Sequence, residues 1–140
     1  MSVKGLSKVL KDLEKFGREA DKGTEIVTKA VSMDIVADAK SFARKDFGKL
    51  AQSIIYTKVA DSDYKVIVNA PYAPYVEFGT GKTVKVPAEL KEIAIQFKGA
   101  GVKEVNLQPR PFLYPAFVKG RTQYVKDLKH LLTTLTKKYK

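Results

Sequence analysis

The sequence predicts a single α+β domain: two N-terminal helices, a small antiparallel sheet, a short central turn and a long C-terminal helix. Apolar residues recur at helical spacing near both ends of the 140-residue chain. β-rich runs lie between residues 53 and 69, and a block punctuated by prolines and glycines follows them. A chain of this length can bury a core without disulfides or metals.

The first predicted helix carries an apolar stripe at helical spacing. Its members are Leu6, Val9, Leu10, Leu13 and Phe16. Gly5 and Gly17 weaken the helix, each by up to ~1 kcal/mol if it lies in the interior. We therefore expect residues 1–20 to form a helix that is mobile until it docks on a partner.

The second helix is predicted to begin at Asp21 or Thr24, either of which can act as its N-cap. Its core stripe is expected to be Ile26, Ala30, Met33 and Ala37, widened by Val27, Val31 and Phe42. Asp34 and Asp38 lie one helical turn apart, as a pair of metal ligands would. Nearby lysines argue against a metal there, and no further ligand is apparent.

A β-hairpin is predicted next, with strands over residues 53–59 and 64–69. The polar residues 60–63 between them favour a turn. Tyr64, Val66 and Val68 share one face of the second strand, which indicates a sheet covered by helices on that side.

The segment Tyr72-Ala73-Pro74-Tyr75-Val76-Glu77-Phe78-Gly79-Thr80-Gly81 is bounded by prolines and glycines, and leaves room for about one helical turn. Two interpretations of it stay open. In one, Tyr72, Tyr75 and Phe78 close one end of the core and Glu77 points to water. In the other, Glu77 pairs with Arg110, which opens a second block of the same kind, Pro109 to Phe117.

The intervening excursion, residues 82–108, is long for a loop, which suggests a role of its own. A helix is predicted from Pro87 to Phe97 or Lys98, and a strand over residues 102–107. We expect the excursion to serve assembly by contacting a neighbouring subunit, through Leu90, Ile93 and Phe97.

A long helix is predicted from Pro111 onward. Its apolar stripe is Phe117, Tyr124, Leu128, Leu131 and Leu135. The net charge of +11 is concentrated here, since residues 101–140 carry nine basic and two acidic side chains. Lys129, Lys137, Lys138 and Lys140 are candidates for binding an acidic partner or phosphates, although a merely solvated face is an open alternative.

The block from Tyr72 to Gly81 and the block from Pro109 to Phe117 together resemble a known protein family. YAPYVEFGTG, followed by RPFLYPAF, resembles the HK97 gp10-like tail-component proteins of long-tailed bacteriophages. Gly48-Lys49-Leu50 leading to Ser53-Ile54 matches the family's usual entry into its first strand, so the likeness runs from about residue 48 to 117. The matching motif residues are Tyr72, Ala73, Tyr75, Glu77, Phe78, Gly79, Arg110, Pro111, Phe112 and Pro115. The lysine-rich segment from Thr83 to Gln108 departs from the pattern, so no family role is carried over to it.

The resemblance implies a structural virion protein of the head–tail neck, a tail-completion or minor tail component that forms a ring joining tail to head. The implied partners are copies of the chain in a cyclic hexamer or dodecamer, neighbouring connector or stopper proteins, and the tail terminator or tail tube. The implied location is the neck or tail of the virion, with assembly in the host cytoplasm.

The composition of the chain and the motifs it lacks argue against several other functional classes. The chain has no cysteine, which excludes disulfides, thiolate metal sites and cysteine nucleophiles. No apolar run reaches the ~20 residues of a membrane span, and no signal peptide opens the chain. His130 is the single histidine, and no nucleophile elbow, phosphate loop or metal-spaced acidic cluster occurs. We expect no enzyme, cofactor or metal. The competing class is a basic nucleic-acid-binding module, whereas a neck protein should make at most weak, non-specific DNA contact.

Overall fold

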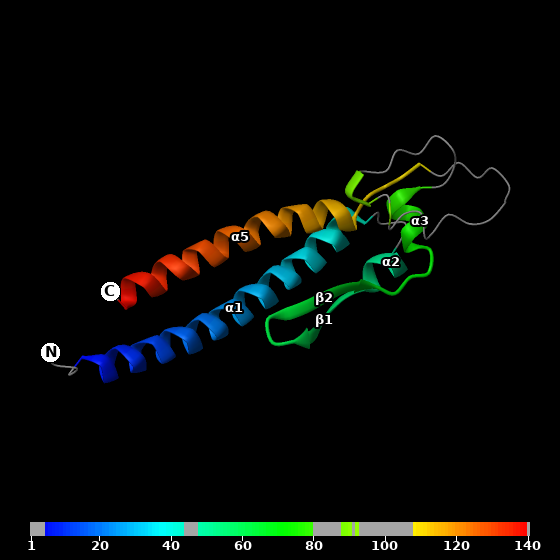
Figure 1. Cartoon of the computed structure of the whole chain (residues 1–140). Helices are drawn as coiled ribbons and strands as arrows, with labels where there is room; N and C mark the ends of the chain where they lie inside the picture. Colours follow the sequence, from blue (N-terminus) through cyan, green and yellow to red (C-terminus); the bar gives the residue numbers. More distant parts are fainter. Residues whose placement is uncertain (1–4, 44–47, 80–87, 91, 93–107, 140) are drawn as a thin grey trace.

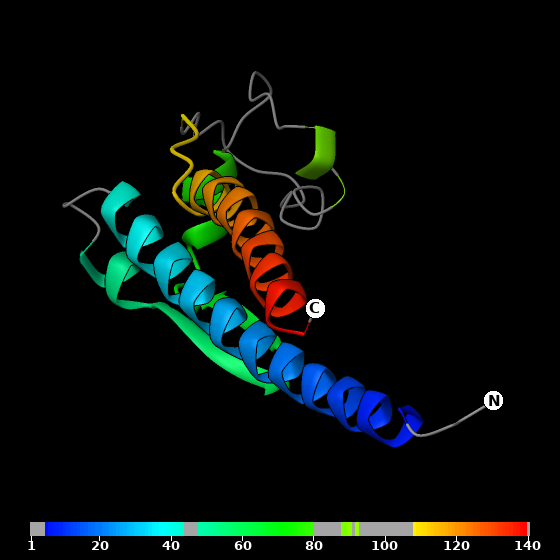
Figure 2. The same cartoon turned by 90° about the vertical axis from the view of Figure 1, so that its left-hand side faces the viewer.

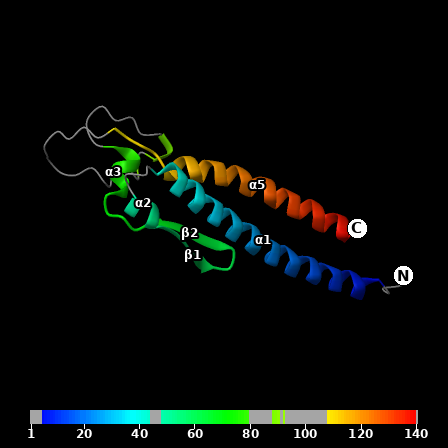
Figure 3. The same cartoon turned by 180° about the vertical axis from the view of Figure 1, so that it is seen from behind.

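The computed structural model describes residues 5–43, 48–79, 88–90, 92 and 108–139. Its elements are α1 (Leu6–Phe42), α2 (Gly48–Gln52), β1 (Ile54–Ala60), β2 (Asp63–Val68), α3 (Ala73–Phe78), the 3₁₀ turn η2 (Ala88–Leu90) and α5 (Leu113–Lys138). Helix α1 is the axis of the molecule, with α5 along one side and the β-hairpin along another (Figures 1 and 3). The predicted α+β class is confirmed.

The expected division of the N-terminal region into two helices is wrong, because α1 runs unbroken for 37 residues. Thr24 does not cap a second helix. Its hydroxyl donates to the Ala20 carbonyl at 2.7 Å, a bond made inside a continuing helix. Asp21, the other candidate cap, also lies inside α1. A Cβ at Gly23 would lie 2.5 Å from Leu131 Cδ1. This glycine therefore gives α5 room to approach.

Helices α1 and α5 pack antiparallel, and small residues let them approach closely. A Cβ at Gly120 would lie 2.3 Å from Ile35 Cγ1. Further along, the hydroxyls of Thr28 and Tyr124 lie 3.1 Å apart and share a hydrogen bond. The core between α1 and α5 includes Val31, Ile35, Val36, Ala39, Phe112 and Ala116.

The stripe expected to bury the middle of α1 faces outward. Ile26 is 68% exposed and Met33 is 48% exposed, and Ala30 and Ala37 are exposed with them. Helix α1 has two apolar faces at helical spacing, and α5 packs on the one that carries Val31 and Ile35. Periodicity alone could not decide between these two faces.

Strands β1 and β2 form the predicted antiparallel hairpin, with Ile54 opposite Val68 and Tyr56 opposite Val66. These four side chains pack with the core. A two-stranded hairpin is marginal in water and needs a surface to pack on, which α1 supplies. The turn brings Ser62 into the left-handed region, with φ 58°.

The segment before the sheet forms the short helix α2, which buries Leu50 completely and leads into β1. Of the helix predicted from Pro87, the structure describes the turn η2 over Ala88–Leu90 and the single residue Glu92. Ile93, Phe97 and the predicted strand over residues 102–107 lie outside the described residues. Among the helices that are described, none is long and apolar enough to cross a membrane.

Candidate functional site

The two punctuated blocks meet at the start of α5, as their proposed pairing required. The backbone N–H of Arg110 donates to the Val76 carbonyl at 2.8 Å. On the same side, α3 buries Ala73, Val76 and Glu77. Phe112, just ahead of α5, is 1% exposed and belongs to the same core. The short helix α3 and the start of α5, which are far apart in the sequence, are therefore in direct contact.

Glu77 is the centre of this junction, and its side chain accepts three backbone hydrogen bonds. Oε2 accepts from the N–H groups of Phe112 and Leu113, at 2.9 and 3.0 Å, and Oε1 accepts from Tyr114 at 2.8 Å. The first N–H groups of a helix have no intrahelical partner and form its positive end. Helix α5 has no capping side chain of its own at Phe112. Glu77 therefore caps α5 from α3.

The expected ion pair between Glu77 and Arg110 is wrong. The Arg110 side chain is exposed, and no ion pair joins the two residues, both of which the structure describes. The physical reason is that the helix N-terminus already occupies both carboxylate oxygens. The alternative, in which Glu77 points to water, is also wrong because Glu77 is 8% exposed.

The local sequence explains how α3 presents Glu77. Pro74 lies in the first turn of α3, where its missing N–H is no loss. Gly79 ends the helix at φ 71° and ψ −178°, a conformation essentially restricted to glycine, and its N–H donates to the Tyr75 carbonyl at 2.9 Å. Tyr72 and Tyr75 are 37% and 43% exposed, so these two rings do not close the core.

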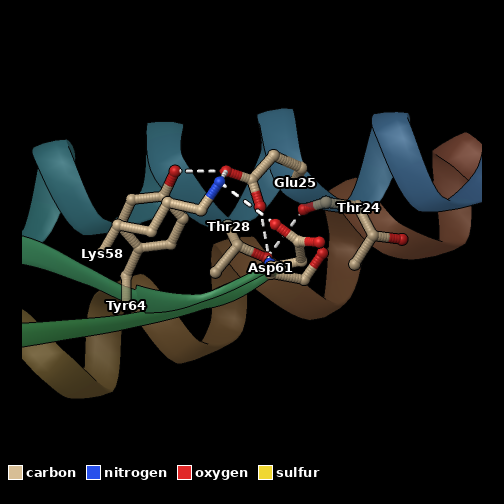
Figure 4. Close-up of polar contacts among 7 residues, drawn as sticks. Thr24, Glu25, Thr28, Lys58, Asp61 and Tyr64 are labelled. Carbon is tan, nitrogen blue, oxygen red and sulfur yellow. Dashed lines mark hydrogen bonds and ion pairs between the residues drawn. The ribbon is translucent and has the colours of Figure 1, made fainter.

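A second anchor joins the hairpin turn to α1 through Glu25, which the sequence did not single out (Figure 4). Its carboxylate accepts hydrogen bonds from the Ser62 backbone N–H and the Tyr64 hydroxyl. Lys58 lies 2.9 Å from Oε1 of Glu25 and 3.3 Å from Asp61. Because Lys58 and Tyr64 come from different strands, Glu25 fixes both strands to the helix.

These contacts change the pKa of Glu25. Hydrogen bonds from the Tyr64 hydroxyl, from Lys58 and from the Ser62 N–H lower its pKa to about 2, since each favours the charged carboxylate. The same contact raises the pKa of Tyr64. No sequence pattern marks this site, because its donors are a backbone group and side chains some 35 positions away.

Asp34 and Asp38 are the acidic residues that the sequence analysis considered as metal ligands. Asp38 forms an ion pair with Lys119 of α5, with Oδ2 and Nζ 3.2 Å apart. Within the described residues, no three His, Asp or Glu side chains are grouped as metal ligands. Asp34 and Asp38 thus offer no described metal centre.

The residues predicted to bind a partner differ in their exposure and contacts. Lys129 and Lys137 are exposed on α5. Lys138 forms an ion pair with Glu19 of α1 at 2.7 Å, and Leu90 is half-buried in η2. Lys140 lies outside the described residues, as do Ile93 and Phe97.

Large apolar side chains are exposed on both long helices, and they include Phe117, which the sequence analysis placed in the apolar stripe of the C-terminal helix. Leu6, Val9, Leu10 and Leu13 at the start of α1 are all more than half exposed. On α5, Phe117, Val125 and Leu132 are 48%, 46% and 55% exposed. A small chain with such rows of exposed apolar residues presents surfaces suited to protein contacts.

Comparison with family models identifies a match over the first half of the chain. Residues 7–79 match the family model described as "Bacteriophage HK97-gp10, putative tail-component". This stretch covers more than half of the chain. It runs from α1 through α3 and includes Glu77, whereas the second block, with Arg110 and Phe112, lies beyond it. No curated protein and no solved structure matches the chain.

Proposed function

The chain belongs to the HK97-gp10-like family of bacteriophage tail components, and we propose that it is a tail-completion protein of the head–tail neck, whose copies form a ring that joins tail to head. Structural tail component is the role of the family; the ring and its position are our proposal. Neighbouring connector or stopper proteins and the tail terminator or tail tube are the proposed partners.

The observation that carries the proposal is the exposure of apolar rows on both long helices. The seven residues of these rows, four at the start of α1 and three on α5, are between 46% and 61% exposed. At the same time, Glu25 and Glu77 hold the hairpin and the start of α5 in place through several hydrogen bonds each. Firmly connected elements with uncovered apolar faces are what a subunit of a permanent assembly requires.

The charge of α5 supports a second contact, with a neighbouring protein of acidic surface. Lys126, Lys129 and Lys137 are exposed on α5, and Asp127 is the sole acidic residue between Leu113 and Lys138. A one-signed helix face steers association and fixes orientation more than it adds affinity.

DNA binding is the competing use of the same lysines. A channel that held the genome tightly would obstruct its passage, so we expect affinity for duplex DNA in the non-specific range, a Kd of ~10⁻⁴ to 10⁻⁶ M at physiological salt. Nanomolar, sequence-selective binding by the purified chain would favour a DNA-binding function instead.

The proposal is tested by removing the protein during phage growth. Phage lacking the chain should accumulate filled heads and complete-length tails that stay separate, as seen by electron microscopy. Adding the purified protein to such an extract should join them. Normal joining in its absence would contradict the proposal, and an absence of tails would point to an earlier role in tail assembly.

A further inference from the structure

The first turns of α1 carry an apolar stripe that α5 does not reach. Phe16 packs edge-on against Tyr139, with ring centroids 5.8 Å apart, and Lys138 pairs with Glu19. Helix α5 ends at Lys138. The turns of α1 before Phe16 continue past that end (Figure 2). We call Leu6, Val9, Leu10 and Leu13, which are 53%, 53%, 52% and 61% exposed, the overhang stripe.

Helical spacing puts the overhang stripe in line with the face that packs on α5. Leu6, Leu10 and Leu13 lead through Gly17 and Ala20 toward Val27 and Val31 at steps of three, four or seven. Val31 is in the core and Val27 packs against it. The stripe therefore continues an established helix-packing face beyond the point where α5 ends.

Gly17 indicates what kind of partner covers this face. A Cβ at Gly23 or Gly120 would clash with the opposite helix, so both glycines allow close packing within the chain. A Cβ at Gly17 would meet nothing within 4 Å. A glycine inside a helix is unfavourable relative to alanine. Gly17, four residues after Leu13, would suit the close approach of a helix from another molecule.

Helix α5 offers a matching unpaired surface. Phe117, Val125 and Leu132 are spaced by eight and seven residues, which places them along one side of the helix. We call these three residues the α5 flank; they are between 46% and 55% exposed. Arg121 lies over the Phe117 ring, 5.9 Å from its centroid, and Lys129 is one turn from both Val125 and Leu132.

Charges next to the two surfaces are complementary. Asp12 is three residues after Val9, and Glu14 is four after Leu10, so both acids border the overhang stripe. Lys8, Lys11 and Lys15 stand at spacings that turn them away from it. Two α5 flanks facing one another would bring Arg121 and Lys129 against their own copies, whereas the overhang stripe brings Asp12 and Glu14 to them.

We propose that the overhang stripe of one subunit packs on the α5 flank of a second copy. The contact is heterologous, joining different surfaces of the two copies, which is the kind of contact that generates rings when the rotation closes. This inference rests on the proposed function, since it names the surfaces through which the ring would form. It covers both apolar rows at once, which pairing of two overhang stripes would not do.

The test uses full-length chain and measures mass by light scattering and sedimentation. Leu10→Lys on the overhang stripe and Leu132→Asp on the α5 flank should each reduce the assembly to single chains. Ile26→Lys, at a 68% exposed position on another face of α1, should leave the mass unchanged. Circular dichroism and thermal melting verify that each variant is folded.

Mixing identifies the geometry. Leu10→Lys retains an intact α5 flank and Leu132→Asp retains an intact overhang stripe, so the mixture should form complexes that neither variant forms alone. If Leu132→Asp alone assembles like the wild type, the proposed pairing is overturned in favour of overhang pairing with itself. If the wild type assembles and Leu10→Lys does too, this interface is wrong although the ring proposal stands. A wild type that stays a single chain at high concentration overturns both.

Discussion

The backbone N–H of Phe112 donates to Oε2 of Glu77 at 2.9 Å, joining residues 35 positions apart. This buried contact places the first turn of α5 against the last turn of α3. One carboxylate therefore helps to fix the start of α5, and packing against α1 positions the rest of that helix.

Replacing Glu77 with glutamine should lower the free energy of unfolding by about 1–3 kcal/mol. A carboxamide has one acceptor oxygen, so its NH₂ group would face a helix N–H that then lacks a partner, and the charge at the positive end of α5 is lost. Urea denaturation of the two proteins measures the difference. A change within ±0.5 kcal/mol would show that the three hydrogen bonds contribute little.

Arg110→Gln is the matched control for this junction. Its side chain is exposed, and its contact with α3 is made by the backbone N–H, which glutamine retains. The expected change in unfolding free energy is therefore within ±0.5 kcal/mol. A loss of unfolding free energy as large as that of Glu77→Gln would instead support an ion pair between Glu77 and Arg110.

The Glu25 anchor should make stability depend on pH in the acid range. The pKa of Glu25 falls to about 2 on folding, from ~4.3 in an unfolded chain. Its stabilising contribution is therefore fully present above the unfolded pKa and is lost as the pH falls toward 2. Melting temperatures of wild type and Glu25→Gln should differ most at pH 6 and converge near pH 2.

Tyr64→Phe provides the control for that pH dependence. The Tyr64 hydroxyl is the largest cause of the lowered pKa of Glu25, so its removal should shift the acid loss of stability to higher pH. An unchanged acid profile in Tyr64→Phe would mean that other groups produce the transition.

The glycines of the two helices should respond to alanine in opposite directions. Gly120→Ala should destabilise the fold by about 1–3 kcal/mol, because its Cβ would lie 2.3 Å from Cγ1 of the buried Ile35. Gly17→Ala in the Leu10→Lys background should stabilise it by up to ~1 kcal/mol, because its Cβ enters open space. Thermal unfolding ranks the variants; stabilisation by Gly120→Ala would contradict the close packing of α1 and α5.

Neutralising the lysines near the end of α5 should impair function without affecting the fold. Lys129→Gln combined with Lys137→Gln removes two exposed charges, and we expect less joining of heads to tails at an unchanged melting temperature. Lys138 is retained because it pairs with Glu19. Full joining activity in this double variant would exclude these lysines from the acidic contact.

Much of the fold could be predicted from the sequence because its signals are local. The alternation of Tyr64, Val66 and Val68 indicated which face of the hairpin is covered, and the polar residues after Ala60 indicated its turn. The long C-terminal helix followed from apolar spacing alone. The continuity of α1 could not be predicted, because Asp21 and Thr24 are residue types that commonly cap helices, whereas here both lie inside one helix.

The site was predicted only in outline. The two blocks suggested that Glu77 meets the region of Arg110, and they do meet. The actual partners of Glu77 are backbone N–H groups, which every residue except proline has, so residue identity does not reveal them. Glu25 was missed for the same reason, since one of its donors is the N–H of Ser62.

The location of the protein in the virion tests the proposed function most directly. Intact phage carrying a small epitope after Lys140 can be labelled with gold-conjugated antibody and imaged by electron microscopy. We predict label at the head-proximal end of the tail, and averaged images of that position should show a ring with cyclic symmetry. Label at the distal tip, along the tail tube, or absent from virions would contradict a neck ring.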